Sequence, residues 1–381
     1  MRLSRRAAAV AESATLRLSA AAARLRAGGR EIINLLEGEP DLPLPPAVRE
    51  ATRRALARGE TRYSDASGLP ELRELIARKL KARNGITAAP EDILVTNGAK
   101  QAVYEALQTI CGPGDEVLVP SPYWVTFPEA VRLAGAKPVF VPTRAHRLDL
   151  DAVARAVSPR TRAIIINSPN NPAGAVYSEA ALRGLARLAA KRDFLIVSDE
   201  AYEDFVYDGA AHLSVAALGA ASRTITVQTF SKSFSMTGFR VGFLAAPPEI
   251  ARAARRLHGH VTGNVCTFAQ HGAIAALGLG RGELARRRAV FQKRRDLAYA
   301  LASRTFDCVK PRGGLFVFAD ARRHLGRRFP DSARLAGYLL ETAGVSAVPG
   351  SACGMEGFLR FSFTSPEPAL REAFARIEAA L

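Results

Sequence analysis

Between residues 93 and 245 the sequence alternates short apolar runs, rich in valine and isoleucine, with stretches typical of helices. Strands that are apolar along their whole length are buried on both faces, and strands separated by helices pair in parallel. The pattern therefore predicts an α/β fold whose large domain is a mostly parallel sheet sandwiched by helices. The expected strands lie at 93–96, 116–120, 138–142, 163–168, 195–199, 224–229 and 239–245.

The pattern changes after about residue 280. A long charged helix is predicted to begin near residue 281, followed by two strands with alternating faces and a C-terminal helix. This predicts a smaller α+β domain. The basic, alanine-rich N-terminal stretch is expected to form a loop and an amphipathic helix that join the smaller domain. The predicted division is 45–285 for the large domain, and 1–44 together with 286–381 for the small one.

Composition excludes several classes of protein. The formal net charge is +17, but the basic side chains are mostly arginines spread along the chain, so a nucleic-acid partner is not predicted. The absence of a run of 18 uncharged apolar residues argues against a membrane span. The four cysteines form no CxxC pair, which argues against a zinc site and fits a cytoplasmic protein. We therefore expect no metal, and partners that are small molecules.

Unusual polar residues gather at the predicted strand ends. Ligands of open α/β sheets bind beyond the carboxyl ends of the strands. The loops there contain a lysine between two serines, a strand-end aspartate, an aromatic pair and adjacent asparagines. Neither GxGxxG after the first strand nor GxxxxGK[ST] occurs, so a dinucleotide site and a P-loop are not supported. The loops concerned are 97–100, 120–124, 168–174, 199–202 and 229–232.

At these loops the chain resembles the class I/II aminotransferases of the pyridoxal-phosphate fold-type-I superfamily, and the bacterial aspartate aminotransferase subgroup in particular. The resemblance extends from EGEPDLPLP at 37–45 to FLRFSFTS at 358–365. It implies a fold-type-I enzyme that uses pyridoxal 5′-phosphate to move an amino group from an amino acid to a 2-oxo acid by a ping-pong mechanism. The matching motifs between these two segments are TFSKSFSMTGFRVGF at 229–243, NSPNNPAG at 167–174, SDEAY at 198–202 and PSPYW at 120–124.

The resemblance implies specific catalytic roles. Lys232 binds the cofactor aldehyde and then moves a proton between the substrate and the cofactor, work that suits an amine with a pKa that falls readily on burial. Asp199 pairs with the pyridine nitrogen and keeps it protonated. Tyr202 and Asn171 donate to the phenolic oxygen of the cofactor, and Trp124 stacks on its ring.

A phosphate site is indicated where Gly98, Ala99 and Lys100 open a helix, because free N–H groups at a helix start favour a dianion. By resemblance, Thr229, Ser231 and Arg240 complete it. The family more often has serine or glycine where this chain has Thr229. Tyr63 resembles the tyrosine that reaches the phosphate of the neighbouring subunit, which implies a homodimer with shared active sites.

Substrate recognition also follows from the resemblance. Arg360 would grip the substrate α-carboxylate, beside Asn171 and Trp124. Gly38 belongs to the N-terminal segment that closes over the substrate. Lys100, Ser13 and Thr15 match positions that hold the side-chain carboxylate of an acidic substrate, which favours aspartate or glutamate.

The chain departs from the family at Ala173, where NPTG is commoner than NPAG, and over 258–268, a segment expected to face the partner's active site. Aromatic amino acids and prephenate therefore remain open as substrates. A lyase or decarboxylase on the same scaffold is an alternative. An aminotransferase-like transcription regulator would need a DNA-binding module, whereas only about 30 residues precede EIINLLEGEPD.

Overall fold

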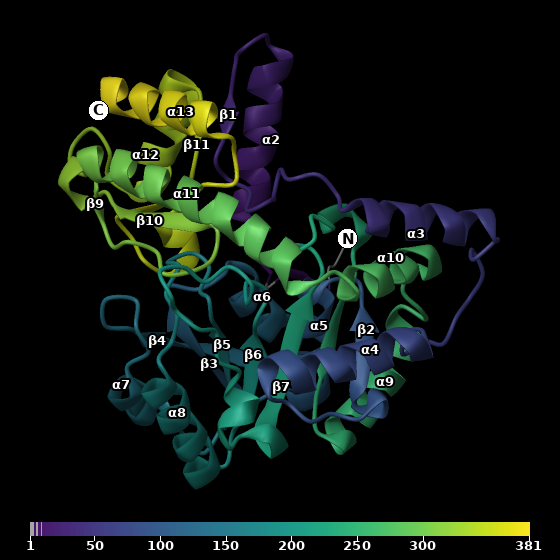
Figure 1. Cartoon of the computed structure of the whole chain (residues 1–381). Coiled ribbons are helices and arrows are strands. Elements are labelled where there is room, and N and C mark those ends of the chain that lie inside the picture. The colour runs from purple at the N-terminus through teal and green to yellow at the C-terminus, as the bar shows by residue number, and fades with distance from the viewer. Residues whose placement is uncertain (1–3, 5–6, 9) are drawn as a thin grey trace.

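The computed structural model describes residues 4, 7–8 and 10–381 (Figure 1). The part of the expected N-terminal loop that falls on residues 1–3, 5–6 and 9 lies outside the described residues. The expected N-terminal helix is α2 (Ala14–Ala27), and the Ser13 hydroxyl caps it by accepting the Leu16 N–H. It packs against strands near the C-terminus of the chain.

The core of the larger part is a seven-stranded sheet in the order β2-β8-β7-β6-β5-β3-β4. Only β8 runs antiparallel to its two neighbours, so the prediction of a mostly parallel sheet is confirmed. The strands are β2 (Ile93–Thr96), β3 (Glu116–Ser121), β4 (Lys137–Pro142), β5 (Thr161–Asn167), β6 (Leu195–Asp199), β7 (Thr224–Thr229) and β8 (Gly242–Ala245).

Helices cover both faces of this sheet. Val117 and Val119 of β3 pack into one core, with side chains of α5, α6 and α9, whereas Leu118 between them packs into another, with α7 and α8. A third core joins β2 and β8 to α4 and α10. The helices of this part are α3 (Pro46–Ala57), α4 (Pro70–Lys79), α5 (Ala99–Ile110), α6 (Thr126–Leu133), α7 (Leu150–Ala156), α8 (Glu179–Arg192), α9 (Pro248–Val261) and α10 (Thr267–Leu277).

One predicted strand was too long. The expectation of a strand over 239–245 is wrong at its start, because β8 begins only at Gly242. A 3₁₀ turn covers Thr237–Phe239, and Arg240 has a left-handed backbone with φ +55°. Such a backbone is uncommon outside glycine, and it turns the Arg240 side chain toward the strand ends instead of into the sheet.

The smaller part is built on a four-stranded antiparallel sheet in the order β12-β13-β10-β9, with β1 and β11 paired beside it. Figure 1 shows the long helix α11 running from the large sheet to this part. Its core contains Phe316, Phe361 and Phe374, so the predicted α+β part is confirmed. Its elements are β1 (Ile33–Asn34), α11 (Arg281–Thr305), β9 (Asp307–Cys308), β10 (Phe316–Asp320), α12 (Ser332–Tyr338), β11 (Val345–Ser346), β12 (Val348–Pro349), β13 (Phe358–Ser362) and α13 (Glu367–Ala380).

None of the helices in the described part of the chain has the length and apolar character needed to span a bilayer.

Candidate active site

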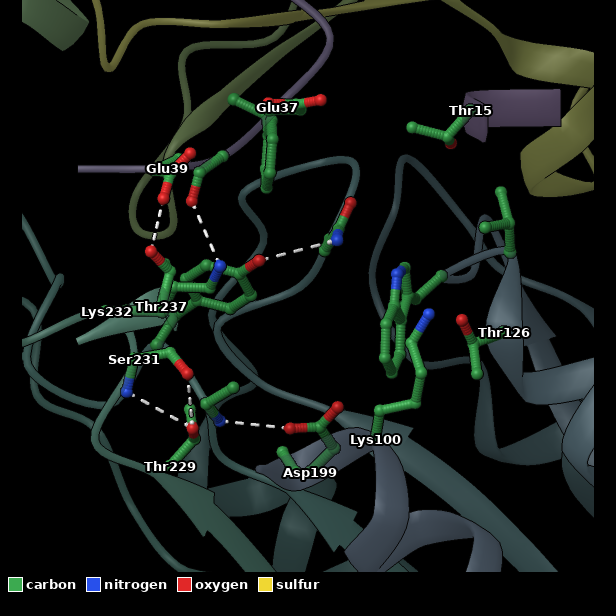
Figure 2. Close-up of a pocket in the computed structure, with 18 of the residues that line it drawn as sticks. Thr15, Glu37, Glu39, Lys100, Thr126, Asp199, Thr229, Ser231, Lys232 and Thr237 are labelled. Carbon is green, nitrogen blue, oxygen red and sulfur yellow. Dashed lines mark hydrogen bonds between the residues drawn. The ribbon is translucent and has the colours of Figure 1, made fainter. Parts of the chain in front are cut away.

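A cavity of about 380 Å³ lies at the carboxyl ends of the parallel strands, where the two parts of the chain meet (Figure 2). It brings together nearly all of the residues predicted from the sequence. Two predicted residues are not in the lining: Gly98, which directly precedes the lining residue Ala99, and Tyr63, which lies outside the cavity. The predicted residues that line the cavity are Ser13, Thr15, Gly38, Ala99, Lys100, Trp124, Asn171, Asp199, Tyr202, Thr229, Ser231, Lys232, Arg240 and Arg360.

Lys232 lies in the turn that follows β7. Its Nζ donates a hydrogen bond to the Gly38 carbonyl oxygen at 3.1 Å, which joins the lysine to the N-terminal segment. Burial lowers the pKa of Lys232 to about 8; the charge of Glu39 opposes this decrease, and Arg240 adds to it. An amine with this pKa can lose and regain a proton near neutral pH.

Asp199 ends β6 at the bottom of the cavity, and its side chain is buried. Its Oδ1 accepts the Ala201 N–H at 3.0 Å, and its backbone carbonyl accepts the Asn167 side chain at 3.0 Å. Burial raises the pKa of Asp199 to about 7, although the Ala201 N–H acts in the opposite direction. A cation placed against this carboxylate would hold it ionised.

A buried polar network supports this strand end from behind. Glu200 accepts hydrogen bonds from Ser214 at 2.7 Å and from Gln228 at 3.0 Å, and His212 Nε2 lies 3.1 Å from it. Glu200, Glu203 and His212 have the spacing of metal ligands. However, the ammonium of Lys79 bonds directly to Glu203, so the negative charge is already paired. The network therefore holds Glu200, the residue next to Asp199, by hydrogen bonds from several segments.

Arg360 enters the cavity from β13 of the smaller part and is buried. Its Nη1 donates to Asn171 Oδ1 at 2.8 Å, and its Nη2 donates to the Leu36 carbonyl. Its guanidinium lies 4.3 Å from the centre of the Phe316 ring, and its Nε has no partner among the described residues. A buried donor without a partner is costly, so the site favours an incoming carboxylate.

Asn171 connects this arginine to Tyr202, because its Nδ2 lies 3.5 Å from the tyrosine hydroxyl. Burial raises the pKa of Tyr202 above its usual value, so the hydroxyl keeps its proton and can donate it in a hydrogen bond. Asn171 and Tyr202 therefore present neutral donors to the same side of the cavity.

The turn before α5 forms an anion cradle. Gly98 has φ +77°, and a Cβ placed on it would lie 2.7 Å from Arg240 Nη2. Arg240 donates to the carbonyl oxygens of Asn97 and Thr237 at 3.3 and 2.9 Å. The first N–H groups of a helix have no partner within the helix, so Ala99 adds a donor beside this guanidinium.

Across the cavity, the hydroxyls of Thr229 and Ser231 are 2.9 Å apart, and the Thr229 hydroxyl also contacts the Val241 carbonyl at 3.2 Å. Threonine therefore keeps the polar contact that serine would make at this position. The two hydroxyls stand on the turn that carries Lys232, so one short segment supplies both a nucleophilic amine and hydroxyl donors.

The Lys100 amine lies 5.3 Å from the centre of the Trp124 ring, a cation–π contact. Burial and the charge of Arg240 lower the pKa of Lys100. Figure 2 shows Thr15 and Thr126 on the same side of the cavity as this amine. Ser13 also lines the cavity, and because its oxygen accepts the Leu16 N–H, its own O–H is left to donate.

Sequence reasoning missed several lining residues. Glu37 and Glu39 flank Gly38, and Glu39 accepts a hydrogen bond from Thr237 (Figure 2). Both lie inside the EGEPD motif, so the motif itself could have revealed them. Phe316 gave no such signal. A Cβ on Gly38 would lie 2.3 Å from its ring, which explains why a glycine stands there.

Tyr63 is 97% exposed and lies outside this cavity. It lines a separate hollow with Asn264 and Cys266, which belong to the divergent 258–268 segment. Thr267 holds the tyrosine loop by donating to the Arg62 carbonyl at 2.9 Å. The divergent segment therefore lies beside Tyr63 and not in this chain's own cavity.

Comparisons with known proteins agree with this geometry. The family model for aminotransferase class I and II matches residues 30–377. A probable aspartate/prephenate aminotransferase of Aquifex aeolicus is 43% identical, over 97% of this chain and 96% of the relative. An aspartate/prephenate aminotransferase of Thermus thermophilus is 42% identical, over 98% of this chain and 97% of the relative.

Solved structures show the same fold. Aspartate aminotransferase from Thermus thermophilus with maleate has a TM-score of 0.95 at 41% identity, and each chain is covered completely. An aromatic aminotransferase from Pyrococcus horikoshii has a TM-score of 0.88 at 40% identity, over 95% of this chain and 98% of the other. With its cavity lysine, strand-end aspartate and anion cradle, the chain belongs to the class I and II aminotransferases, enzymes that use pyridoxal 5′-phosphate to exchange amino groups between amino acids and 2-oxo acids.

Proposed function

We propose that the preferred amino donor of this aminotransferase is aspartate or glutamate. The observation that carries the proposal is a second cation in the cavity. The Arg360 Nε, which has no partner in the described part of the chain, can donate to the α-carboxylate, and Lys100 offers a separate positive charge beside Trp124. A dicarboxylic substrate satisfies both cations, whereas a neutral side chain would leave the partly buried amine unpaired.

The names of the relatives support the same choice. Several are called aspartate aminotransferase or aspartate/prephenate aminotransferase. We propose prephenate as a second candidate, in the role of amino acceptor, because it is a 2-oxo acid that carries another carboxylate. Lys100 could pair with that carboxylate in the same way as with the side chain of aspartate.

The site residues fit pyridoxal 5′-phosphate. The glycine cradle at Gly98 and the donors of Ala99, Thr229, Ser231 and Arg240 suit a phosphate dianion. The side chain of Lys100 is free for the substrate because the cradle needs only its backbone N–H. When bound, the cofactor supplies an electron sink for negative charge at the substrate α-carbon.

The residues of this chain do the remaining work. Lys232 Nζ would hold the cofactor, and as a free amine it would accept the α-proton of the substrate and return a proton, for which a pKa of about 8 is well suited. Asp199 would stabilise positive charge on the ring nitrogen. Tyr202 and Asn171 would donate hydrogen bonds to the phenolic oxygen, and Trp124 would restrict the plane of the ring.

We also propose a homodimer in which Tyr63 completes the phosphate site of the partner. The support is its 97% exposure, unusual for a tyrosine on a loop that Thr267 and Asn264 hold in place. The proposed domains remain 45–285, and 1–44 with 286–381. The four free cysteines support a location in the reducing cytoplasm.

The covalent role of Lys232 can be tested by borohydride reduction of the enzyme with its cofactor, followed by peptide mapping. Because Lys232 is buried in the cavity and its pKa is lowered to about 8, we expect the pyridoxyl group on this amine. Lys232→Ala should carry none. A label on Lys100, or on another lysine, would disprove the assignment.

Asp199→Ala should keep the fold and lower kcat by at least roughly 10²-fold, the loss seen when a key electrostatic partner is deleted. Steady-state kinetics with a common amino donor measures it, and near-normal turnover would refute the role.

The same carboxylate makes the cofactor-free protein sensitive to pH. Between 3.8 and about 7 the buried Asp199 binds more protons in the folded state than in the unfolded state. Its contribution to the free energy of unfolding therefore falls as the pH rises through this window. Asp199→Asn has no such loss, so its cofactor-free form should be the more stable one near pH 8, and the difference should vanish near pH 4 in urea titrations.

Shared active sites predict complementation. Tyr63→Ala and Lys232→Ala, each with low activity alone, should recover part of the activity when refolded together, because one site of each mixed dimer contains both native residues. The proposed dimer is checked separately by measuring the molecular mass of the native protein in solution. A monomer that is fully active at low concentration contradicts the shared site.

Substrate choice is tested by comparing kcat/KM for aspartate and glutamate with asparagine, alanine and phenylalanine. A charged hydrogen bond from Lys100 contributes about 1.5–3 kcal/mol, which is roughly 10- to 150-fold discrimination. Lys100→Ala should remove this preference, whereas Lys191→Ala at the exposed end of α8 should not. If alanine or phenylalanine is the better amino donor, the proposed preference for acidic substrates is wrong, although the enzyme remains an aminotransferase.

A further inference from the structure

A buried carboxylate–histidine pair lies directly behind the anion cradle. His258 of α9 places its Nδ1 2.8 Å and 3.1 Å from the two carboxylate oxygens of Glu105 on α5. Both side chains are completely buried. His258 begins the 258–268 segment that departs from the family pattern, and neither residue touches the cavity. The assigned catalytic roles therefore leave this pair unused.

The pair is joined to the cradle through Gln101. The Gln101 Nε2 donates to Glu105 Oε1 at 3.0 Å, and its Oε1 accepts the Asn97 N–H at 2.6 Å. The same Nε2 also contacts the Thr262 hydroxyl. Because a carboxylate only accepts hydrogen bonds, Glu105 forces the amide nitrogen of Gln101 inward and its oxygen toward Asn97.

The peptide groups around Asn97 are thus held at both ends. Gln101 accepts a hydrogen bond from the Asn97 N–H, and Arg240 donates one to the Asn97 carbonyl oxygen at 3.3 Å. The next residue is Gly98, whose backbone has φ +77°, a conformation that residues with a side chain rarely adopt. A change in the orientation of the Gln101 amide would therefore move the turn that presents its N–H groups to an anion.

We propose that Glu105 and His258 are positioning residues for the cofactor phosphate, acting through Gln101 on the Asn97–Lys100 turn. The proposal rests on the proposed phosphate site. The hydrogen-bonded pair sets the direction of the Gln101 amide before the cofactor arrives, so the cradle loses little entropy on binding. The effect is specific to the phosphate, because the ring and aldehyde of the cofactor meet Asp199 and Lys232 on other strands.

Two probes separate this role from a general structural one. Pyridoxal 5′-phosphate and pyridoxal differ only in the phosphate, so the ratio of their affinities isolates the cradle. Trp124 is the single tryptophan of the chain and lines the cavity, so its fluorescence reports the binding of both to the cofactor-free enzyme. Inorganic phosphate, as a competitor, gives an independent measure of the cradle alone.

The test variant is Glu105→Met with His258→Leu. It removes both polar side chains together, since deleting one member would leave the other buried without its hydrogen-bond partner. We expect its affinity for pyridoxal 5′-phosphate and for inorganic phosphate to fall at least about tenfold, or ~1.4 kcal/mol, while that for pyridoxal changes less than about twofold. Equal losses for pyridoxal and its phosphate, or no loss for either, would overturn the proposal.

Gln101→Met provides a second variant that leaves the Glu105–His258 pair intact. It should show the same loss specific to phosphate, and an unchanged affinity ratio would also overturn the proposal. The matched control is Glu116→Gln. Glu116 is a buried carboxylate at the start of β3, at the end of the large sheet opposite to the cradle, so this variant should leave both affinities unaltered. If the wild-type enzyme binds no pyridoxal 5′-phosphate at all, the proposed phosphate site fails, which is a different outcome from an unchanged ratio.

Discussion

Both faces of the seven-stranded sheet are sealed by helices, so its edge at the carboxyl ends of the strands is the part of the core where polar side chains can gather. Asp199 and the Thr229–Lys232 turn occupy this edge, and burial there shifts their acid–base properties. The pKa of Asp199 rises to about 7 and that of Lys232 falls to about 8. The parallel direction of the strands therefore produces both the cavity and its reactivity.

The smaller part closes this edge and supplies what the sheet lacks. Arg360 reaches across to Asn171 at 2.8 Å, and the Gly38 carbonyl accepts the Lys232 amine at 3.1 Å. The long helix α11 ties the covering segment down, because Arg294 forms two hydrogen bonds with Asp41, at 2.6 and 3.0 Å. A movement of the smaller part would thus act on the lysine and on the substrate arginine together.

Much of the fold was predictable because burial leaves a direct trace in the residue pattern. The strands at 93–96, 195–199 and 224–229 have the predicted bounds. The strand expected from 239 failed because the left-handed Arg240 depends on contacts with Asn97 and Thr237, which a local pattern does not contain. Phe316 was not predicted as a site residue for a similar reason, since only its approach to Gly38 makes it part of the site.

By itself the sequence determined the class of fold and the chemical groups available, because apolar periodicity and motifs such as TFSKSF and SDEAY are local properties of the chain. Tertiary structure alone decided which groups meet. Glu105 and His258 are 153 residues apart in the chain, yet they form a buried hydrogen-bonded pair behind the anion cradle. Such pairs depend on how helices pack over the sheet, and neither residue's own neighbours in the sequence carry that information.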